Sequence, residues 1–310
     1  MVHAPQFPQW KEIEIADREF LHPILWHYQP RTSEWNFTNL FIWRKNYGFR
    51  WSLYREWLLV LCPSGPHGIF ALQPLGPPYR AEAARRLLRW LKEQGVEEPR
   101  IERADRRMVE EVAGETDLTA EPTRDHFDYV YRIQDLVQLS GRKYHAKKNH
   151  VNRFRQSYRF TYADLEESHI PECLKLSASW CELRRCAEDQ NLLREWEAVQ
   201  GGLTHFRELK LRGGAILIEG RVEAFTFGER LNEDTAVVHV EKANPEIPGL
   251  YAMINQQFCE RAWPPEIIYL NREQDLGQEG LRRAKLSYHP DHLIEKFRLR
   301  FAVPKGEGGG

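Results

Sequence analysis

Apolar residues repeat at two different spacings along the first 120 residues. Between residues 81 and 93, leucines recur at helical spacing, which predicts an amphipathic helix. Residues 51–62 and 68–72 are apolar runs of strand length, which predict two strands of a hairpin. The aromatic-rich segment 35–47 favours a buried helix or helix–turn. The pattern therefore predicts an α/β unit over residues 1–120.

The pattern restarts after residues 119–124, whose composition is typical of a linker. Helical spacing predicts helices over 139–158, 172–197, 204–211, 250–263 and 279–286. Alternating or apolar runs predict strands over 127–133, 215–219, 222–229, 235–242, 267–270 and 293–301. This order resembles the GNAT acyltransferase fold, and the first half could be a degenerate copy of it. We expect an α/β (α+β) protein with tandem GNAT-like domains, 1–120 and 125–305, whose mixed sheets are flanked by helices.

Composition restricts the class of protein. The 310 residues are 42% hydrophobic with a formal net charge of -1, which predicts a folded chain whose anionic partners must be bound by a local patch. No signal peptide or transmembrane segment is evident, so we expect a cytoplasmic protein. The five cysteines form no CxxC pair, and Cys181 and Cys186 are expected to be reduced thiols. No metal or cofactor is expected.

One segment concentrates positive charge. Residues 136–163 contain no acidic residue, and as a helix they would carry an apolar stripe with cations on the remaining surface. Ordinary solvated helices interleave both signs, so this segment favours anion binding over a merely solvated face. The candidate phosphate-binding or tRNA-binding residues are Arg142, Lys143, Lys147, Lys148, Asn149, Asn152 and Arg153.

Two stretches that follow one another bear on donor chemistry. Alternation puts His239 and Glu241 on one face of the strand 235–242, which suits general-base catalysis or, alternatively, a structural ion pair. The loop after this strand would bind the acyl-CoA pyrophosphate in a GNAT fold. Here Pro245 and Pro248 remove N–H donors and an acidic residue lies between them, so the loop suits a rigid turn better than an ordinary acyl-CoA site.

A second group of polar residues follows the buried strand 267–270. Arg272 could hold a carboxylate or phosphate, and Glu273 or Asp275 could hold a substrate amine beside Asn271. The alternative is a capped loop in which Asp275 forms an Asx-turn and Gly277 takes a positive φ. Farther along, Tyr288 is a candidate general acid with Lys285 as oxyanion partner, although Tyr288 could instead pack beside a proline.

These motifs, in this order, resemble one family. They are Tyr144-His-x-Lys-Lys-Asn-His-Val-Asn-Arg-Phe154, Val222-x-Ala-Phe-Thr-Phe-Gly228, His239-x-Glu-Lys-Ala-Asn244, Gly249-Leu-Tyr251, Asn271-Arg-Glu-Gln-Asp-Leu-Gly277 and Leu281-Arg-x-Ala-Lys-Leu-Ser-Tyr288. The resemblance is to the phosphatidylglycerol lysyltransferase C-terminal domain family, over residues 127–300. The segment 35–47 is similar to that of its soluble members.

The resemblance implies tandem GNAT-like domains, related to the aminoacyltransferases that modify peptidoglycan precursors. It also implies an aminoacyl-tRNA donor, an acceptor that is a lipid head group or small molecule, and peripheral contact with a membrane. We therefore predict aminoacyl transfer to an amine or hydroxyl group. The alternatives are acyl-CoA-dependent N-acyltransfer and a non-catalytic binding module. The predicted catalytic residues are Glu241, Glu273, Tyr288 and Lys285, and the predicted substrate-binding residues are Arg272, Asp275, Asn271 and His239.

Overall fold

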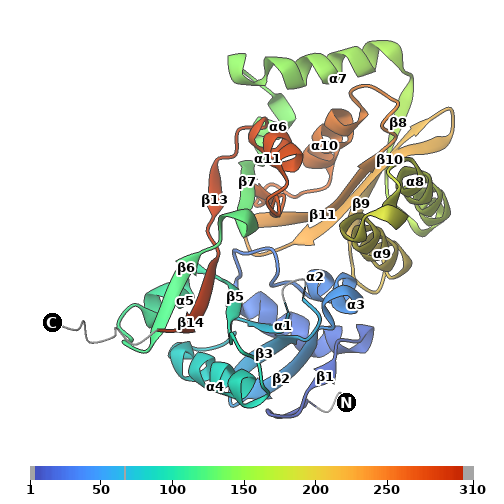
Figure 1. Ribbon diagram of the computed structural model, residues 1–310. Coiled ribbons are helices and arrows are strands. Elements are labelled where there is room, and N and C mark those ends of the chain that lie inside the picture. The colour runs from blue at the N-terminus through green and yellow to red at the C-terminus, as the bar shows by residue number, and fades with distance from the viewer. Residues whose placement is uncertain (1–3, 66–67, 303–310) are drawn as a thin grey trace.

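The computed structural model describes residues 4–65 and 68–302, and in these ranges the strands form two seven-stranded sheets (Figure 1). The first sheet has the order β1-β2-β3-β4-β5-β14-β6 and the second β13-β7-β12-β11-β10-β9-β8. The strands of the first sheet are β1 Lys11–Glu12, β2 Arg50–Tyr54, β3 Trp57–Cys62, β4 Phe70–Leu72, β5 Ile101–Ala104, β6 Leu118–Pro122 and β14 Phe297–Phe301. Those of the second are β7 Asp128–Arg132, β8 Phe160–Asp164, β9 Arg212–Ile218, β10 Arg221–Arg230, β11 Thr235–Ala243, β12 Tyr269–Asn271 and β13 His292–Ile294.

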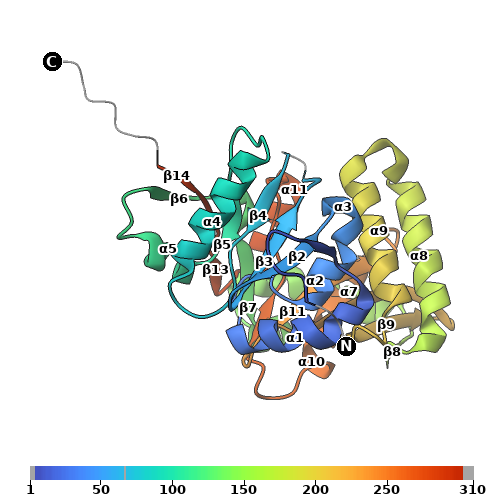
Figure 2. The ribbon, with the colours of Figure 1, turned by 90° about the horizontal axis from the view of Figure 1, so that it is seen from below.

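Helices flank both sheets (Figures 1 and 2). In the first half they are α1 Arg18–Tyr28, α2 Phe37–Ile42, α3 Arg44–Tyr47, α4 Arg80–Glu93 and α5 Arg106–Val112. In the second half they are α6 Ile133–Gln138, α7 His145–Ser157, α8 Ile170–Leu183, α9 Gln190–Thr204, α10 Leu250–Arg261 and α11 Glu279–Leu286. None of the helices in the described ranges combines the length and apolar character that crossing a bilayer requires.

The two sheets share one strand plan. In each, four antiparallel strands lead through a helix into a parallel neighbour: β1 to β4, then α4, then β5, and β8 to β11, then α10, then β12. Two further antiparallel strands complete each sheet. The predicted fold class, α/β with tandem GNAT-like units, is confirmed.

The final strand lies elsewhere than the sequence pattern indicated. Residues 293–301 were expected to be one strand of the second half, but they divide into β13 and β14. β13 pairs with β7 of the second sheet, whereas β14 lies between β5 and β6 of the first. The polar pair Glu295 and Lys296 separates the two strands, so the chain passes from one sheet to the other at this point. The expected range 125–305 therefore contains a strand of the first sheet, and residues 303–305 lie outside the described part.

One hydrophobic cluster spans both halves. Trp35, Phe41 and Trp51 of the first half are buried together with Leu203 and Phe227 of the second. Large buried aromatic side chains contribute much of the hydrophobic stabilisation of such a core. The halves are therefore held together by a shared core.

Three local predictions are wrong. A helix was expected over residues 204–211, but residue 204 ends α9 and residues 205–210 form turns. Residues 51–62 divide at a turn in which Arg55 has φ 54°. Cys181 and Cys186, expected to be reduced thiols, form a disulfide between α8 and the short helical turn that precedes α9. The turn between these helices brings their Cα atoms to 5.1 Å, which is within the range for a disulfide.

Candidate active site

The candidate site opens where two parallel strands diverge. β11 pairs with β12 only from Thr235 to Val237, yet β11 continues to Ala243. His239 and Glu241 lie on the part of β11 that pairs with β10 but extends beyond β12, and they line a cavity of about 570 Å³. Ligand pockets typically measure about 300–1,000 Å³, so this cavity has the size of a small-molecule site.

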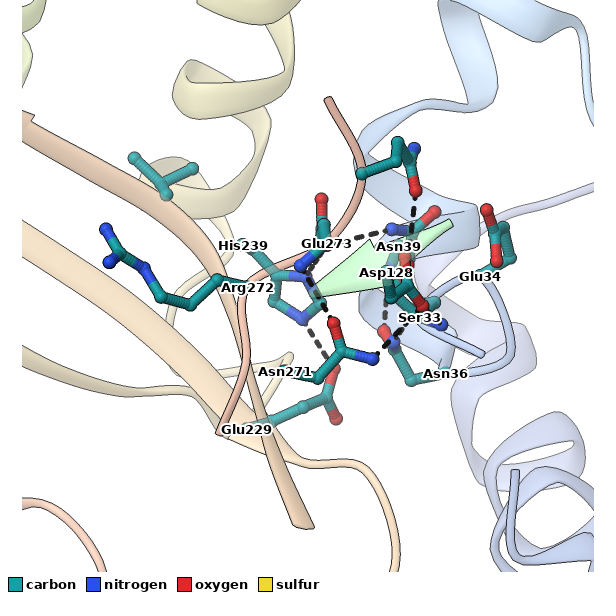
Figure 3. A network of polar contacts seen from close by, with 12 residues as sticks. Ser33, Glu34, Asn36, Asn39, Asp128, Glu229, His239, Asn271, Arg272 and Glu273 are labelled. Carbon is teal, nitrogen blue, oxygen red and sulfur yellow. Dashed lines mark hydrogen bonds and ion pairs between the residues drawn. The ribbon is translucent and has the colours of Figure 1, made fainter. Parts of the chain in front are cut away.

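The cavity collects most of the predicted site residues. Its walls come from β11, the segment after β12, α11, α7, α9, the start of α10 and one residue of the first half, Trp43. The predicted residues that line it are His239, Glu241, Arg272, Glu273, Lys285, Tyr288 and Lys147. Figure 3 shows the network behind its floor, where His239 and Glu273 lie between Glu229 and Asn39.

Arg272 forms the centre of the cavity wall. Its Nη2 atom donates to Glu241 at 3.1 Å, and the other carboxylate oxygen of Glu241 accepts from Asn255 at 3.1 Å. Burial opposes the charge of Arg272, but Glu241 outweighs it and raises the pKa of the guanidinium. The buried Nη1 atom has no hydrogen-bond partner in the described part of the chain. Because an unsatisfied buried donor is costly, this atom is suited to a substrate oxygen.

His239 connects two carboxylates. Its Nδ1 lies 3.0 Å from Glu273 and its Nε2 lies 3.2 Å from Glu229. The His239 side chain is completely buried, which disfavours its charge, but the hydrogen bonds to Glu229 and Glu273 outweigh burial and raise the pKa to about 9. At neutral pH the imidazolium therefore donates to both carboxylates. Asn39 also donates to Glu273 at 3.2 Å, so the first half helps to orient this carboxylate.

The segment after β12 holds a sharp turn. Glu273 has φ 56°, in the left-handed region that non-glycine residues seldom adopt. Asn271 stabilises the turn because its side chain accepts from the Glu273 N–H at 2.8 Å. Lys285 Nζ donates to the carbonyl oxygens of Arg272 and Glu273. Adjacent residues can thus point in different directions, as Arg272 and Glu273 do in Figure 3.

Lys285 consequently has a different position from the one predicted for an oxyanion partner. It lines the cavity, but its ammonium hydrogen-bonds the backbone of the turn. Burial and the nearby Arg272 lower the pKa of Lys285 to about 8. Its contacts in the structure therefore support the turn on which Arg272 and Glu273 are carried.

Two predicted substrate-binding residues lie outside the cavity. Asp275 is fully buried and accepts from Tyr129, Arg282 and the Gly277 N–H. Burial favours its neutral form, but the hydrogen bonds from Arg282 and Tyr129 outweigh burial and lower the pKa to about 2. With Gly277 at φ 74°, this is the Asx-turn alternative. Asn271 is also fully buried and donates to Asp128 at 3.1 Å, in addition to its contact with the turn.

Tyr288 lines the cavity beside Arg272. Its ring meets Tyr131 edge to face, and Lys147 Nζ lies 4.2 Å from its centroid. The Arg272 guanidinium carbon is 4.9 Å from the same centroid. Burial raises the pKa of the Tyr288 phenol despite these cations, so the hydroxyl remains protonated at neutral pH. A protonated hydroxyl on a cavity wall can act as a proton donor.

The acid-free segment forms α7 with a preceding short helical turn. Val151 and Phe154 are buried, and only Lys147 of the predicted phosphate-binding residues lines the cavity. Burial and Arg272 lower the pKa of Lys147. The other six are exposed: Arg142, Lys143, Lys148, Asn149, Asn152 and Arg153. Arg142 and Lys143 lie in the short helical turn and the other four on α7, which is at the top of Figure 1.

The structure gives a physical reason why the loop before α10 suits CoA poorly. Gly249 starts α10 with φ 86°, as the turn interpretation required, and α7 lies directly against it. A Cβ atom at Gly249 would be 2.5 Å from the carbonyl oxygen of His150. This carbonyl presents negative partial charge near the α10 N-terminus, where a pyrophosphate would need N–H donors.

Sequence reasoning did not identify three residues of the network, namely Glu229, Asn39 and Trp43. Glu229 reaches His239 because β10 has an irregularity in its pairing with β11 between Phe227 and Gly228. Asn39 and Trp43 lie in the aromatic segment that predicted a buried helix. The contact of Asn39 with Glu273 and the position of Trp43 at the cavity depend on how the two halves pack together. The pattern of residues along one segment does not reveal such packing. No group of three or more potential metal ligands occurs within residues 4–65 and 68–302.

Comparison with known proteins extends these observations. A family model described as phosphatidylglycerol lysyltransferase, C-terminal, matches residues 27–300. A solved protein of unknown function from Bacteroides thetaiotaomicron VPI-5482 is 34% identical, with a TM-score of 0.86, and the match covers 94% of this chain and 99% of that one. No curated protein matches the chain.

Two more distant structures share the fold. The C-terminal domain assigned to a lysylphosphatidylglycerol synthetase from Agrobacterium fabrum is 12% identical, with a TM-score of 0.63 and coverage of 93% of this chain and 92% of that one. L-PGS from Bacillus licheniformis is 13% identical, with a TM-score of 0.64 and coverage of 97% and 93%. Identities this low show similarity of fold alone.

Proposed function

We propose that this chain, which belongs to the phosphatidylglycerol lysyltransferase C-terminal family, moves an aminoacyl group from aminoacyl-tRNA to an amine or hydroxyl acceptor. Membership of the family makes the chain an acyltransferase or aminoacyltransferase. The observation that supports the reaction most directly is the Nη1 atom of Arg272 on the cavity wall near Glu241 and Tyr288, which has no hydrogen-bond partner among residues 4–65 and 68–302. The acceptor would be a lipid head group or a small molecule.

The side chains fit the steps of ester aminolysis or transesterification. The acceptor nitrogen or oxygen attacks the ester carbonyl carbon, and Arg272 Nη1 donates to the carbonyl oxygen as negative charge develops there. The bond between that carbon and the ribose oxygen then breaks. Tyr288 gives its proton to the leaving ribose oxygen, and Glu241 takes the proton that the acceptor loses and returns it to Tyr288. Protons therefore balance over one cycle.

The remaining groups would position the substrates. Glu273 is oriented by His239 and Asn39, and its carboxylate faces the cavity where an aminoacyl ammonium could be held. Lys285 would act on the reaction only by holding the turn that carries Arg272 and Glu273. The proposed roles of Glu273 and Lys285 rest on the contacts that these two side chains make.

The tRNA donor is supported by charge and by steric occlusion. Cations and amides on exposed α7 offer a row of contacts for a phosphate backbone, starting at Lys147 beside the cavity. The α10 N-terminus, in contrast, is covered by the His150 carbonyl group. A lipid acceptor would require the same basic rim to approach an anionic membrane surface, which gives the peripheral membrane contact that we propose.

The experiment is an incubation of the protein with a panel of charged tRNAs and with amine, hydroxyl and lipid-vesicle acceptors. We expect protein-dependent loss of one aminoacyl ester with matching gain of an aminoacylated acceptor. The Arg272→Gln variant should abolish the gain, whereas Lys148→Glu should weaken tRNA binding in a salt-dependent way. No transfer from any charged tRNA, together with a raised melting temperature in acetyl-CoA, would replace this proposal with acyl-CoA-dependent transfer.

A further inference from the structure

A second groove lies apart from the reaction cavity and is mostly cationic. It measures about 510 Å³ and is formed by α1, the turn before β9 and the end of β10. Four basic side chains line it against a single carboxylate, Glu229, which His239 already engages. The basic residues are Arg18, Lys210, Arg212 and Arg230.

Arg18 is the decisive residue of this groove. It is only 7% exposed, and its Nε atom has no hydrogen-bond partner among the described residues. No carboxylate in the described ranges forms an ion pair with it. A buried guanidinium without a counter-ion loses hydration and gains no compensating attraction. Arg18 therefore lacks an anion, and the groove beside it has room for one.

The other groups of the groove are arranged around Arg18. His22 and Trp26 follow Arg18 at intervals of four residues, so all three occupy one face of α1. Burial and Arg18 lower the pKa of His22, which leaves the imidazole neutral at neutral pH and able to donate one hydrogen bond.

The remaining basic side chains have only partial partners. Arg230 has a buried Nε without a partner, lies over the Trp26 ring at 5.4 Å and reaches Glu266 at 3.4 Å. Lys210 is 3.9 Å from Glu19 in an exposed pair, which solvent weakens. Arg212 uses one Nη atom on a backbone carbonyl group. Positive charge therefore dominates the groove.

We propose that this groove binds a small phosphate-bearing molecule, with Arg18 as the main ligand and Arg230 and Lys210 closing over the phosphate oxygens. Guanidinium groups prefer phosphate because two parallel N–H donors match two of its oxygens. The volume exceeds that of a bare phosphate, and Pro23 and Trp26 supply an apolar wall for the rest of the ligand.

The groove is separate from the site of transfer. Of its lining residues, only Glu229 contacts the network behind the reaction cavity, and the residues of α1 that form its floor precede the segment matched by the family model. The inference therefore stands independently of the proposed transfer reaction.

The test uses the full chain and two probes, inorganic pyrophosphate and adenosine monophosphate, titrated by calorimetry at constant ionic strength. The variants are Arg18→Gln, which removes the buried charge, and Lys210→Glu, which changes an exposed side chain and should not disturb folding. Lys148→Glu on α7 reports on the competing basic surface. The two probes distinguish a site for bare phosphate from one that also uses the apolar wall.

We expect the wild-type chain to bind at least one probe and both groove variants to weaken that binding by at least about tenfold. Lys148→Glu should bind as the wild type does. The proposal is overturned if neither probe binds the wild type, if Lys210→Glu binds normally, or if Lys148→Glu alone removes binding. Should Arg18→Gln fail to fold, Lys210→Glu decides the question.

Discussion

The segment Asn271–Asp275 supplies side chains to two polar clusters with different properties. One is the cluster around the buried Lys296, which donates to Glu34, Asp128 and Gln274 at 2.7, 2.6 and 3.0 Å. The other is the cavity wall around Arg272, where a buried donor has no partner in the described part of the chain. Asn271 belongs to the first cluster through Asp128, whereas Arg272 belongs to the second.

The difference shows that a cluster of polar residues does not by itself indicate a substrate-binding site. Both clusters consist of charged residues near the boundary of the two halves, yet the Lys296 ammonium has its partners within the protein. Burial and Glu34 raise the pKa of Asp128 even though Lys296 opposes this effect. A cluster whose donors are occupied holds structure together, and one with a free donor at a cavity can bind a substrate. Mutations should separate stability from activity accordingly.

The largest effect is expected from Lys296→Met. It leaves the buried carboxylate of Asp128 without its cation and leaves Glu34 with Arg103 at 3.6 Å, which should reduce the free energy of unfolding by about 3–5 kcal/mol. Urea unfolding followed by fluorescence measures this. The control is Arg106→Ala, which breaks the exposed ion pair with Glu295 and should cost less than about 1 kcal/mol. Equal losses in the two variants would contradict a structural role for the buried cluster.

Arg272→Gln should have the opposite profile. Loss of the Nη1 donor is expected to reduce kcat about 10²–10³-fold, which is typical for removal of one oxyanion-stabilising donor. Unfolding should change less than in Lys296→Met because Glu241 keeps its contact with Asn255. Steady-state transfer assays and urea unfolding together measure the two effects. A variant that unfolds readily but transfers normally would reverse our assignment of the clusters.

The third prediction concerns His239, which lies between the cavity and the interior. Its folded-state pKa of about 9 exceeds its ordinary value of 6.5. The stabilisation is therefore complete below about pH 6.5 and is lost as pH rises through about 9, by up to about 3 kcal/mol. Urea unfolding from pH 6 to 9.5 should show this decline in the wild type. His239→Gln should lack most of it, and an unchanged decline in that variant would exclude His239 as its source.

The smallest effect is expected from Tyr288→Phe. The ring can still pack against Tyr131 and beneath Lys147, so stability should change little. Loss of the hydroxyl should lower kcat about 10–100-fold if it protonates the leaving oxygen. A donor with a better leaving group should lose less activity in this variant. If Tyr288→Phe is as active as the wild type with every donor, Tyr288 only packs the cavity wall.

Elements with strong local patterns were predictable. The helix expected at residues 81–93 is α4, and the helix expected at 279–286 is α11 with those bounds. In α4, buried leucines on one face and charged residues on the other determine the helix locally. Residues 204–211 carry a similar mixture, but residues 205–210 form turns after α9. The destination of β14 was not predictable because five alternating residues do not specify which sheet they join.

The candidate site divides in the same way. Arg272 and Glu241 were predicted because they follow or lie on buried strands, and Tyr288 because of its place in a GNAT-like order of elements. The cavity brings the three together. Asp275 has the same local context but meets Tyr129, which is 146 residues away in sequence. Such a distant partner decides whether a carboxylate is occupied or free. The residue types in the sequence therefore indicated the kind of chemistry, whereas tertiary contacts decide which of these side chains is available to a substrate.

The position of β14 has a consequence for how the chain is made. β14 is synthesised after the other strands of the described residues, yet it lies between β5 and β6 of the first sheet. A ribosome must therefore release the chain as far as residue 301 before the first half can complete its sheet. Until then β5 and β6 would present open edges, which are prone to pairing with other chains. Nascent chains halted before residue 297 should depend on chaperones, and the two halves should mature together rather than in order of synthesis.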